Sequence, residues 1–159
     1  MNKSSFLDKN NFWAIAHRGA NLLAPENTIE AFTAAVNLGF EYLETDVRAS
    51  IDGVPFIMHD ANLSRMTGEN LDINSLTSDD IDSIKINGTS LIPKLTDVFE
   101  MFPGQNFNVD AKSSEVVIPL AKAIKKTNMY EKVCIGSYSD GRITKTMREL
   151  NRQVCHSAG

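Results

Sequence analysis

The sequence is poor in cysteine and has no long apolar run. Its 159 residues include two cysteines, Cys134 and Cys155, too few for a disulfide framework. We therefore expect buried free thiols and a reducing, cytoplasmic location. No stretch approaches the roughly 18 consecutive apolar residues of a membrane-spanning helix. The polar first residues also lack the apolar segment of a secretory signal, so the sequence predicts no transmembrane segment.

Positive charge is also in short supply. Lys and Arg number 16 against 20 Asp and Glu, giving a formal net charge of −4. A nucleic-acid-binding protein normally carries a basic stripe, so we expect no nucleic-acid partner. Repeats and Ser/Gly-rich linkers are absent, and the hydrophobic content of 42% is that of a globular domain. We expect a polar extension over residues 1–11 and one domain over residues 12–159.

Short apolar runs alternate with segments of helical periodicity. The sequence predicts strands at residues 12–16, 40–47, 54–58, 107–112, 133–138 and 153–156, and helices at residues 27–38, 96–102, within 114–127 and at 140–150. The first helix has Asn27 and Glu30 at capping-box positions and ends before Gly39. Strands alternating with helices predict a parallel α/β fold. A closed eight-stranded barrel takes about 250 residues, so the options are a small open sheet or an incomplete barrel.

Polar residues at the ends of expected strands call for an explanation. Glu44 and Asp46 are two positions apart on one strand, so they share a face. Two neighbouring carboxylates repel each other unless a cation lies between them, and such oxygen ligands suit Mg²⁺ or Ca²⁺. An exposed or ion-paired acidic pair on an edge strand is the alternative interpretation.

The same arrangement recurs at other strand ends. Asp110 and Lys112 share a face of a later strand, while His17 precedes Arg18 and His59 precedes Asp60. Carboxylates can hold a hard cation, and Arg and Lys can attract a phosphoryl group. Two histidines can serve as base and acid on opposite sides of a phosphodiester. The set therefore indicates phosphodiester cleavage.

An ordered run of motifs extends this pattern: His17-Arg18-Gly19, Pro25-Glu26-Asn27-Thr28, Glu44-Thr45-Asp46-Val47, Asp52-Gly53, His59-Asp60, and then Leu63, Arg65 and Thr67-Gly68. From about residue 12 to residue 138 the sequence closely resembles the glycerophosphodiester phosphodiesterase family. The resemblance implies a TIM-barrel hydrolase of phospholipid and glycerol metabolism. Its partner would be a small-molecule glycerophosphodiester, which it splits into an alcohol and glycerol 3-phosphate.

The resemblance also implies roles for particular residues. His17 and His59 would be the acid–base pair, Arg18 and Lys112 would contact the phosphate, and one divalent cation, Mg²⁺ or Ca²⁺, would bind to Glu44, Asp46 and Asp110. Asp110 stands where the family usually has the longer Glu. Glu26 and Asn27 are interpreted as supporting residues, Glu26 bracing the loop beside His17 and Asn27 capping the helix. Asp60 and Arg65 would be structural partners, Ser137-Tyr138 a substrate wall, and His156 incidental.

Two routes fit the implied reaction. The glycerol hydroxyl beside the ester attacks phosphorus and water then opens the cyclic phosphate, or water attacks directly. One histidine removes the attacking proton and the other protonates the leaving alcohol, and the sequence leaves open which does which.

The sequence ends after the sixth expected strand, so we expect an incomplete TIM barrel with about six of its eight strands. A truncated chain or gene fragment, a natural short form that closes by self-association through exposed sheet edges, and a decayed inactive remnant are the three explanations. Alternative functions are a related phosphodiesterase of the phospholipase type and a scaffold that only binds.

Overall fold

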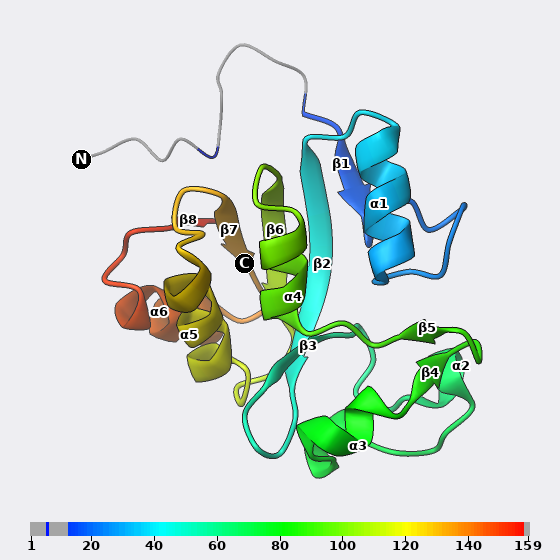
Figure 1. The fold of residues 1–159 in the computed structure, drawn as a ribbon. Coiled ribbons are helices and arrows are strands. Elements are labelled where there is room, and N and C mark those ends of the chain that lie inside the picture. The colour runs from blue at the N-terminus through cyan, green and yellow to red at the C-terminus, as the bar shows by residue number, and fades with distance from the viewer. Residues whose placement is uncertain (1–5, 7–12, 158–159) are drawn as a thin grey trace.

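The structure is a computed structural model that describes Phe6 and residues 13–157. A six-stranded sheet forms its centre, as Figure 1 shows. Five of the described strands run parallel in the order β1 (Ile15–His17), β2 (Tyr42–Ala49), β6 (Asn106–Ala111), β7 (Val133–Gly136) and β8 (Cys155–His156). The helices between them are α1 (Ile29–Asn37), α4 (Leu95–Met101), α5 (Val117–Thr127) and α6 (Asp140–Glu149). The predicted α/β alternation is confirmed.

The helices pack on one face of the sheet because the strands alternate in polarity. Leu43, Val47 and Val109 are fully buried and belong to the main core with residues of all four helices. The opposite face carries the polar residues in register, so that Glu44 pairs with Asn108 and Asp46 with Asp110. Active-site residues of TIM barrels come from the C-terminal ends of several parallel strands.

The third strand departs from the parallel pattern. β3 (Pro55–Ile57) runs antiparallel to the end of β2, with Val47 opposite Ile57. Gly53 turns the chain between them with φ +79°, a conformation that glycine adopts without strain. His59 was expected to close a strand equivalent to the others, which is wrong. It reaches the same edge because the hairpin returns the chain, and the Met58 N–H donates to the Asp46 carbonyl at 2.9 Å.

A segment without predicted elements follows β3. Residues 58–94, here called the excursion, contain α2 (Ser64–Thr67), a short 3-10 helix (Ile73–Ser75), α3 (Ser78–Asp82) and the strand pair β4 (Lys85–Ile86) and β5 (Ser90–Leu91). These elements surround a separate small core with Phe56 of β3. In Figure 1 the excursion lies to one side of the sheet, below α1.

The start of α1 differs from its prediction. Its N-cap is Thr28, whose hydroxyl accepts a hydrogen bond from the Ala31 N–H, and not Asn27. Asn27 lies before the helix at φ +60° and is 2% exposed. The expectation that Asn27 caps this helix is therefore wrong, because its side chain is used elsewhere.

An aromatic contact lies at the start of β2, on the face that Glu44 and Asp46 share. Tyr42 donates its hydroxyl to the Phe6 carbonyl at 2.7 Å, and the two rings meet edge to face. Cys134 joins this small cluster, and both cysteines are free thiols, with Cys134 buried and Cys155 half-buried. Apart from Phe6, the expected extension over residues 1–11 lies outside the described residues. Within the described part of the chain, no helix has the length and apolar character needed to cross a membrane.

Candidate active site

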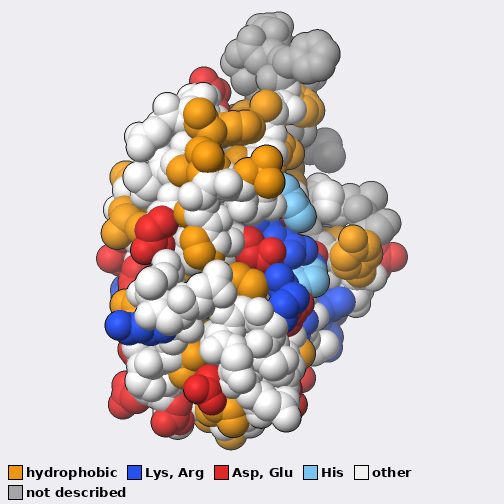
Figure 2. All heavy atoms as spheres, turned by 90° about the vertical axis from the view of Figure 1, so that its right-hand side faces the viewer, with side chains coloured by type: hydrophobic (Ala, Val, Ile, Leu, Met, Phe, Trp, Pro, Cys, Tyr) orange, Lys and Arg blue, Asp and Glu red, His pale blue; other side chains and the backbone are white. Residues whose placement is uncertain are grey.

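Charged side chains gather at the carboxyl ends of β1, β2 and β6. Figure 2 shows histidine, acidic and basic side chains in one group on this face of the molecule. In the register of the sheet His17 is aligned with Glu44, and Asp46 with Asp110. The parallel strands thus bring together residues that are far apart in the sequence.

The loop after β1 holds Arg18 in a strained conformation. Arg18 has φ +56°, in the left-handed region that non-glycine residues seldom adopt. Its N–H donates to the Glu44 carboxylate at 3.0 Å. The loop then passes against α1 so closely that a Cβ on Gly19 would lie 2.7 Å from the Ala31 backbone. The tight turn directs the Arg18 side chain toward Asp46.

Asp46 is the most enclosed of the three predicted carboxylates, with a side chain 2% exposed. Nε of Arg18 lies 3.0 Å from its Oδ2, and Nζ of Lys112 lies 3.0 Å from its Oδ1. Asn27 donates from Nδ2 to Oδ2 at 3.0 Å and accepts from the Thr45 hydroxyl at 2.9 Å. Asn27 therefore contacts Asp46 and Thr45 and does not cap α1, and its supporting role stays a prediction.

Lys112 connects an aspartate of β2 with an aspartate of β6. Its Nζ lies 2.7 Å from Oδ2 of Asp110 as well as contacting Asp46. Although burial opposes its charge, hydrogen bonds to the two aspartates raise the pKa of Lys112 above its ordinary value. The same ammonium group lies 5.6 Å from the centre of the Tyr138 ring.

Glu44 lies at the edge of this group, beside His17. Its side chain is 13% exposed, and its Oε2 lies 3.8 Å from Nε2 of His17. Burial, together with the negative charge of Asp46, raises the pKa of Glu44 to about 7. A carboxylate in such surroundings is stabilised by a proton or by added positive charge.

The donor set fits a hard divalent cation. A hollow of about 260 Å³ is lined by Glu44, Asn108 and Asp110, among others. Oδ1 of Asp110 and Oδ1 of Asn108 are buried and have no hydrogen-bond partner among the described residues. Buried acceptor oxygens are seldom left unpaired, and Mg²⁺ and Ca²⁺ bind such oxygens.

The three carboxylates nevertheless do not surround one point as placed. Among the described residues no group of three or more His, Cys, Asp and Glu side chains is arranged to hold an ion. Instead, the positive charge of Lys112 lies between Asp46 and Asp110 and contacts both. Asn108 was not predicted to belong to the site; its position two residues before Asp110, on the same face, was the available signal.

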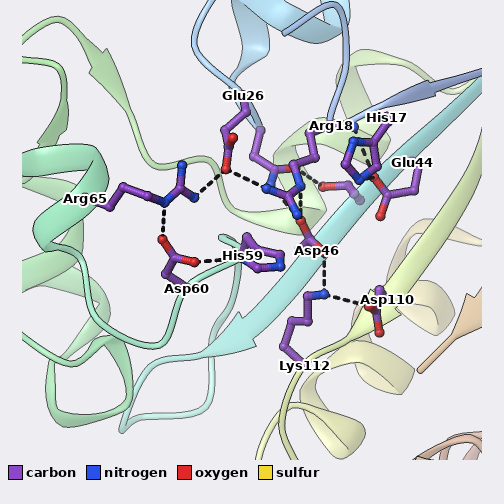
Figure 3. Close-up of polar contacts among 12 residues, drawn as sticks. His17, Arg18, Glu26, Glu44, Asp46, His59, Asp60, Arg65, Asp110 and Lys112 are labelled. Atoms are coloured by element: carbon purple, nitrogen blue, oxygen red, sulfur yellow. Dashed lines mark hydrogen bonds and ion pairs between the residues drawn. The ribbon is translucent and has the colours of Figure 1, made fainter. Parts of the chain in front are cut away.

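His59 is linked to this group through a chain of ion pairs, drawn in Figure 3. Its Nδ1 lies 2.7 Å from Oδ1 of Asp60, and Asp60 accepts a hydrogen bond from Nε of Arg65. Arg65 also donates to Glu26 at 2.6 Å, and Glu26 accepts from Nη1 of Arg18 at 3.0 Å. All nine predicted site residues thus belong to one connected set, in which Asp60 and Arg65 are partners as expected.

The remaining predictions concern the rim. Tyr138 lines the hollow and its side chain extends into solvent, 91% exposed. Ser137 is buried, and its hydroxyl donates to the Ala111 carbonyl. His156 is exposed on β8. Both members of the predicted Ser137-Tyr138 pair line the hollow, and their role as a substrate wall stays a prediction.

Comparison with known proteins agrees with this geometry. Residues 17–154 match the model of the glycerophosphoryl diester phosphodiesterase family. The chain belongs to this family. It is 36% identical over 147 residues to the probable glycerophosphodiester phosphodiesterase 2 of Mycobacterium tuberculosis, covering 92% of this chain and 56% of the relative. It is 36% identical over 157 residues to the glycerophosphodiester phosphodiesterase of Caldanaerobacter subterraneus subsp. tengcongensis, covering 89% of this chain and 63% of the relative.

Solved structures show the same fold. The glycerophosphodiester phosphodiesterase of Agrobacterium tumefaciens superposes with a TM-score of 0.82 at 26% identity, covering 89% of this chain and 64% of that one. A phosphodiesterase of Oleispira antarctica, in complex with the product sn-glycerol-3-phosphate, superposes with a TM-score of 0.81 at 23% identity, covering 91% and 64%. The chain is therefore a partial TIM barrel that spans somewhat less than two thirds of the length of these relatives.

Proposed function

We propose that this chain carries the catalytic residues of a glycerophosphodiester phosphodiesterase, which hydrolyses its substrate to an alcohol and glycerol 3-phosphate. The observation that carries the proposal is the connected set at the edge of β1, β2 and β6. There two histidines, two phosphate-attracting cations and three carboxylates from distant parts of the chain lie side by side. Membership of the family supports the same reaction.

Arg18 and Lys112 are placed to hold the phosphate. Their side chains are 17% and 12% exposed, and each contacts Asp46. Their charges neutralise the phosphodiester anion and the charge that builds up on it during attack. Partial burial strengthens this interaction relative to the same charges in water.

One divalent cation would be held by Glu44, Asp46 and Asp110, with Asn108 contributing a further oxygen to the same hollow. When bound, it supplies Lewis-acid stabilisation of the phosphoryl oxygens. Lys112, which contacts Asp46 and Asp110, would add its own positive charge to the same site.

His17 and His59 carry the proton transfers. One removes the proton from the glycerol hydroxyl beside the ester, whose oxygen bonds to phosphorus as the bond to the leaving alcohol breaks. The other protonates that alcohol. Water then adds to the cyclic phosphate with the two roles reversed, giving glycerol 3-phosphate; direct attack of water at phosphorus is the alternative route.

A second substrate class follows from one relative. The protein named lysophospholipase D GDPD1 of Rattus norvegicus is 32% identical over 162 residues, covering 92% of this chain and 50% of the relative. A lysophospholipid carries the same phosphodiester with an acyl chain on the glycerol. We include it as a candidate substrate.

The decisive experiment measures glycerol 3-phosphate release from glycerophosphocholine by the 159-residue chain, with Mg²⁺, with Ca²⁺ and with a chelator. With lysophosphatidylcholine, assayed in parallel, the measured product is lysophosphatidic acid. We expect cation-dependent release that His17→Ala and His59→Ala each reduce by about 10²–10⁴-fold, the usual contribution of a positioned acid or base. His156→Ala is the matched control, because His156 is exposed and lies outside the connected set. Absence of product with either cation, or full turnover in both histidine variants, would contradict the proposal.

A further inference from the structure

Arg65 occupies a particular position in the ion-pair chain. It lies on α2 of the excursion and contacts two carboxylates that come from different parts of the molecule. Nε binds Asp60, which follows the β3 hairpin, and Nη2 donates to Glu26 of the loop between β1 and α1 at 2.6 Å. Figure 3 shows the guanidinium group of Arg65 between the two acids.

Each acid in turn holds a residue of the proposed reaction. Oδ1 of Asp60 faces Nδ1 of His59 at 2.7 Å. A carboxylate there favours the tautomer with the proton on Nδ1, which leaves Nε2 as the free acceptor. In Figure 3 the far side of the His59 ring faces the side where Asp46 and Lys112 lie. On the other arm, Oε1 of Glu26 accepts from both Arg65 and Arg18.

An ion pair on a protein surface ordinarily contributes little, and Arg65 itself is 48% exposed. Its partners are better enclosed, at 18% for Glu26 and 27% for Asp60. The planar guanidinium group offers several N–H donors in fixed directions, which suits it to hold two carboxylates at once. Burial opposes their ionisation, yet the hydrogen bonds from Arg65 lower the pKa of both Asp60 and Glu26. The double contact of Arg65 thus favours the charged forms of Asp60 and Glu26.

We propose that Arg65 is a positioning residue, whose double contact holds Asp60 on Nδ1 of His59 and Glu26 on Arg18. It couples the two halves of the site: the histidine that comes from the excursion and the phosphate-attracting arginine that comes from the barrel loop. The inference extends the proposed function. Its direct readouts are properties of the side chains and do not depend on turnover.

The experiment follows the imidazole and guanidinium signals of the full chain by ¹H–¹⁵N NMR. The three histidines of the sequence can be told apart by substitution. In the parent chain near neutral pH we expect the Nδ1–H tautomer at His59. Arg65→Met should shift His59 toward the Nε2–H form and move the Arg18 Nε–H signal. Arg65→Lys keeps the charge but reaches fewer partners, so it should give smaller changes of the same kind.

Separate arms distinguish the two contacts. Asp60→Ala should change His59 and leave Arg18 nearly unmoved, whereas Glu26→Gln should do the reverse. Arg148→Met is the matched control, since Arg148 is exposed in the last turn of α6, away from the site. It should move neither signal.

A lowered melting temperature in Arg65→Met and Arg65→Lys with both signals unmoved would overturn the proposal, because Arg65 would then only stabilise the excursion. If Arg65→Met does not fold, Arg65→Lys decides on the same signals. Where the chain turns over substrate, Arg65→Met should lower kcat at least about tenfold, within what a positioned acid or base contributes. A chain without turnover would count against the proposed function and leave the NMR result to decide the role of Arg65.

Discussion

Nδ2 of Asn27 donates a hydrogen bond to Oδ2 of Asp46 over 3.0 Å, although the two residues lie 19 positions apart. Asn27 is buried at φ +60°, and its Oδ1 also accepts from Thr45. The nitrogen and the oxygen of the Asn27 side-chain amide are therefore both hydrogen-bonded. The side chain fixes the rotation of the Asp46 carboxylate and connects the loop after β1 to β2.

We predict that Asn27→Asp destabilises the chain by about 1–3 kcal/mol, the usual cost of leaving a buried polar group unsatisfied. The new carboxylate replaces the donor with an acceptor next to Asp46 and adds like charge. Urea unfolding measures the loss. Asn151→Asp is the control, because Asn151 has φ +51° but is exposed; equal losses at the two positions would refute the special role of the Asn27 amide.

The shared face of Glu44 and Asp46 could be predicted because strand alternation is local and has a period of two residues, whereas the alignment of Asp46 with Asp110 depends on the register of β2 and β6. The role of Asn27 could not, because its partners are set by the tertiary path of the loop. A residue next to an apolar helical stretch fits a cap equally well, and Thr28 takes that position instead.

The elements of the excursion could not be predicted from the sequence for a different reason. Its elements are two to five residues long, too short for a hydrophobic period to be recognised. The antiparallel direction of β3 depends on pairing with Val47–Ala49, although Asp52-Gly53 is a hairpin signal. The prediction that His59 belongs to the site therefore rests on the resemblance to the family and not on a strand end.

Gly19 lies so close to Ala31 of α1 that any side chain at this position would overlap with it. A Cβ there would meet the backbone carbon of Ala31 at 2.7 Å, and the residue has φ +77°. We predict that Gly19→Ala costs about 1–2 kcal/mol for the backbone conformation and about 1–3 kcal/mol more for the overlap. Thermal unfolding of the purified variant measures the sum.

Gly53→Ala isolates the conformational part. Gly53 has nearly the same φ, +79°, and nothing within 4 Å of the added carbon. We expect it to lose only the backbone contribution. Equal losses in the two variants would contradict the close packing of the β1 loop on α1.

We predict that Glu44 makes the stability of the chain fall with rising pH when a chelator is present. Burial and Asp46 raise its pKa from 4.5 to about 7 in the folded chain, so between these values the folded state holds more protons than the unfolded state. Its contribution to stability is therefore present below about pH 4.5 and is lost as the pH rises toward 7. The full loss is about 3 kcal/mol at 1.36 kcal/mol per pKa unit.

Glu44→Gln removes this titration. The stability of the variant, measured by urea unfolding from pH 4 to pH 8, should fall less with rising pH than that of the parent chain. Glu30→Gln serves as control, because Glu30 is exposed in the first turn of α1. Parallel curves for the parent chain and Glu44→Gln would show that Glu44 titrates normally.

Asp110 provides the test of cation binding that is independent of turnover. Its Oδ1 is buried with no hydrogen-bond partner in the part of the chain that the structure describes, and Asp110 lines the same hollow as Glu44 and Asn108. We predict that Asp110→Asn weakens Mg²⁺ or Ca²⁺ binding, measured by calorimetry, by more than the 10–100-fold typical of a residue that only supports a ligand. Asp79→Asn, at an exposed position on α3, should leave the affinity unchanged. Equal affinities in both variants would remove Asp110 from the ligand set and leave it as the ion-pair partner of Lys112, whose Nζ lies 2.7 Å from its Oδ2.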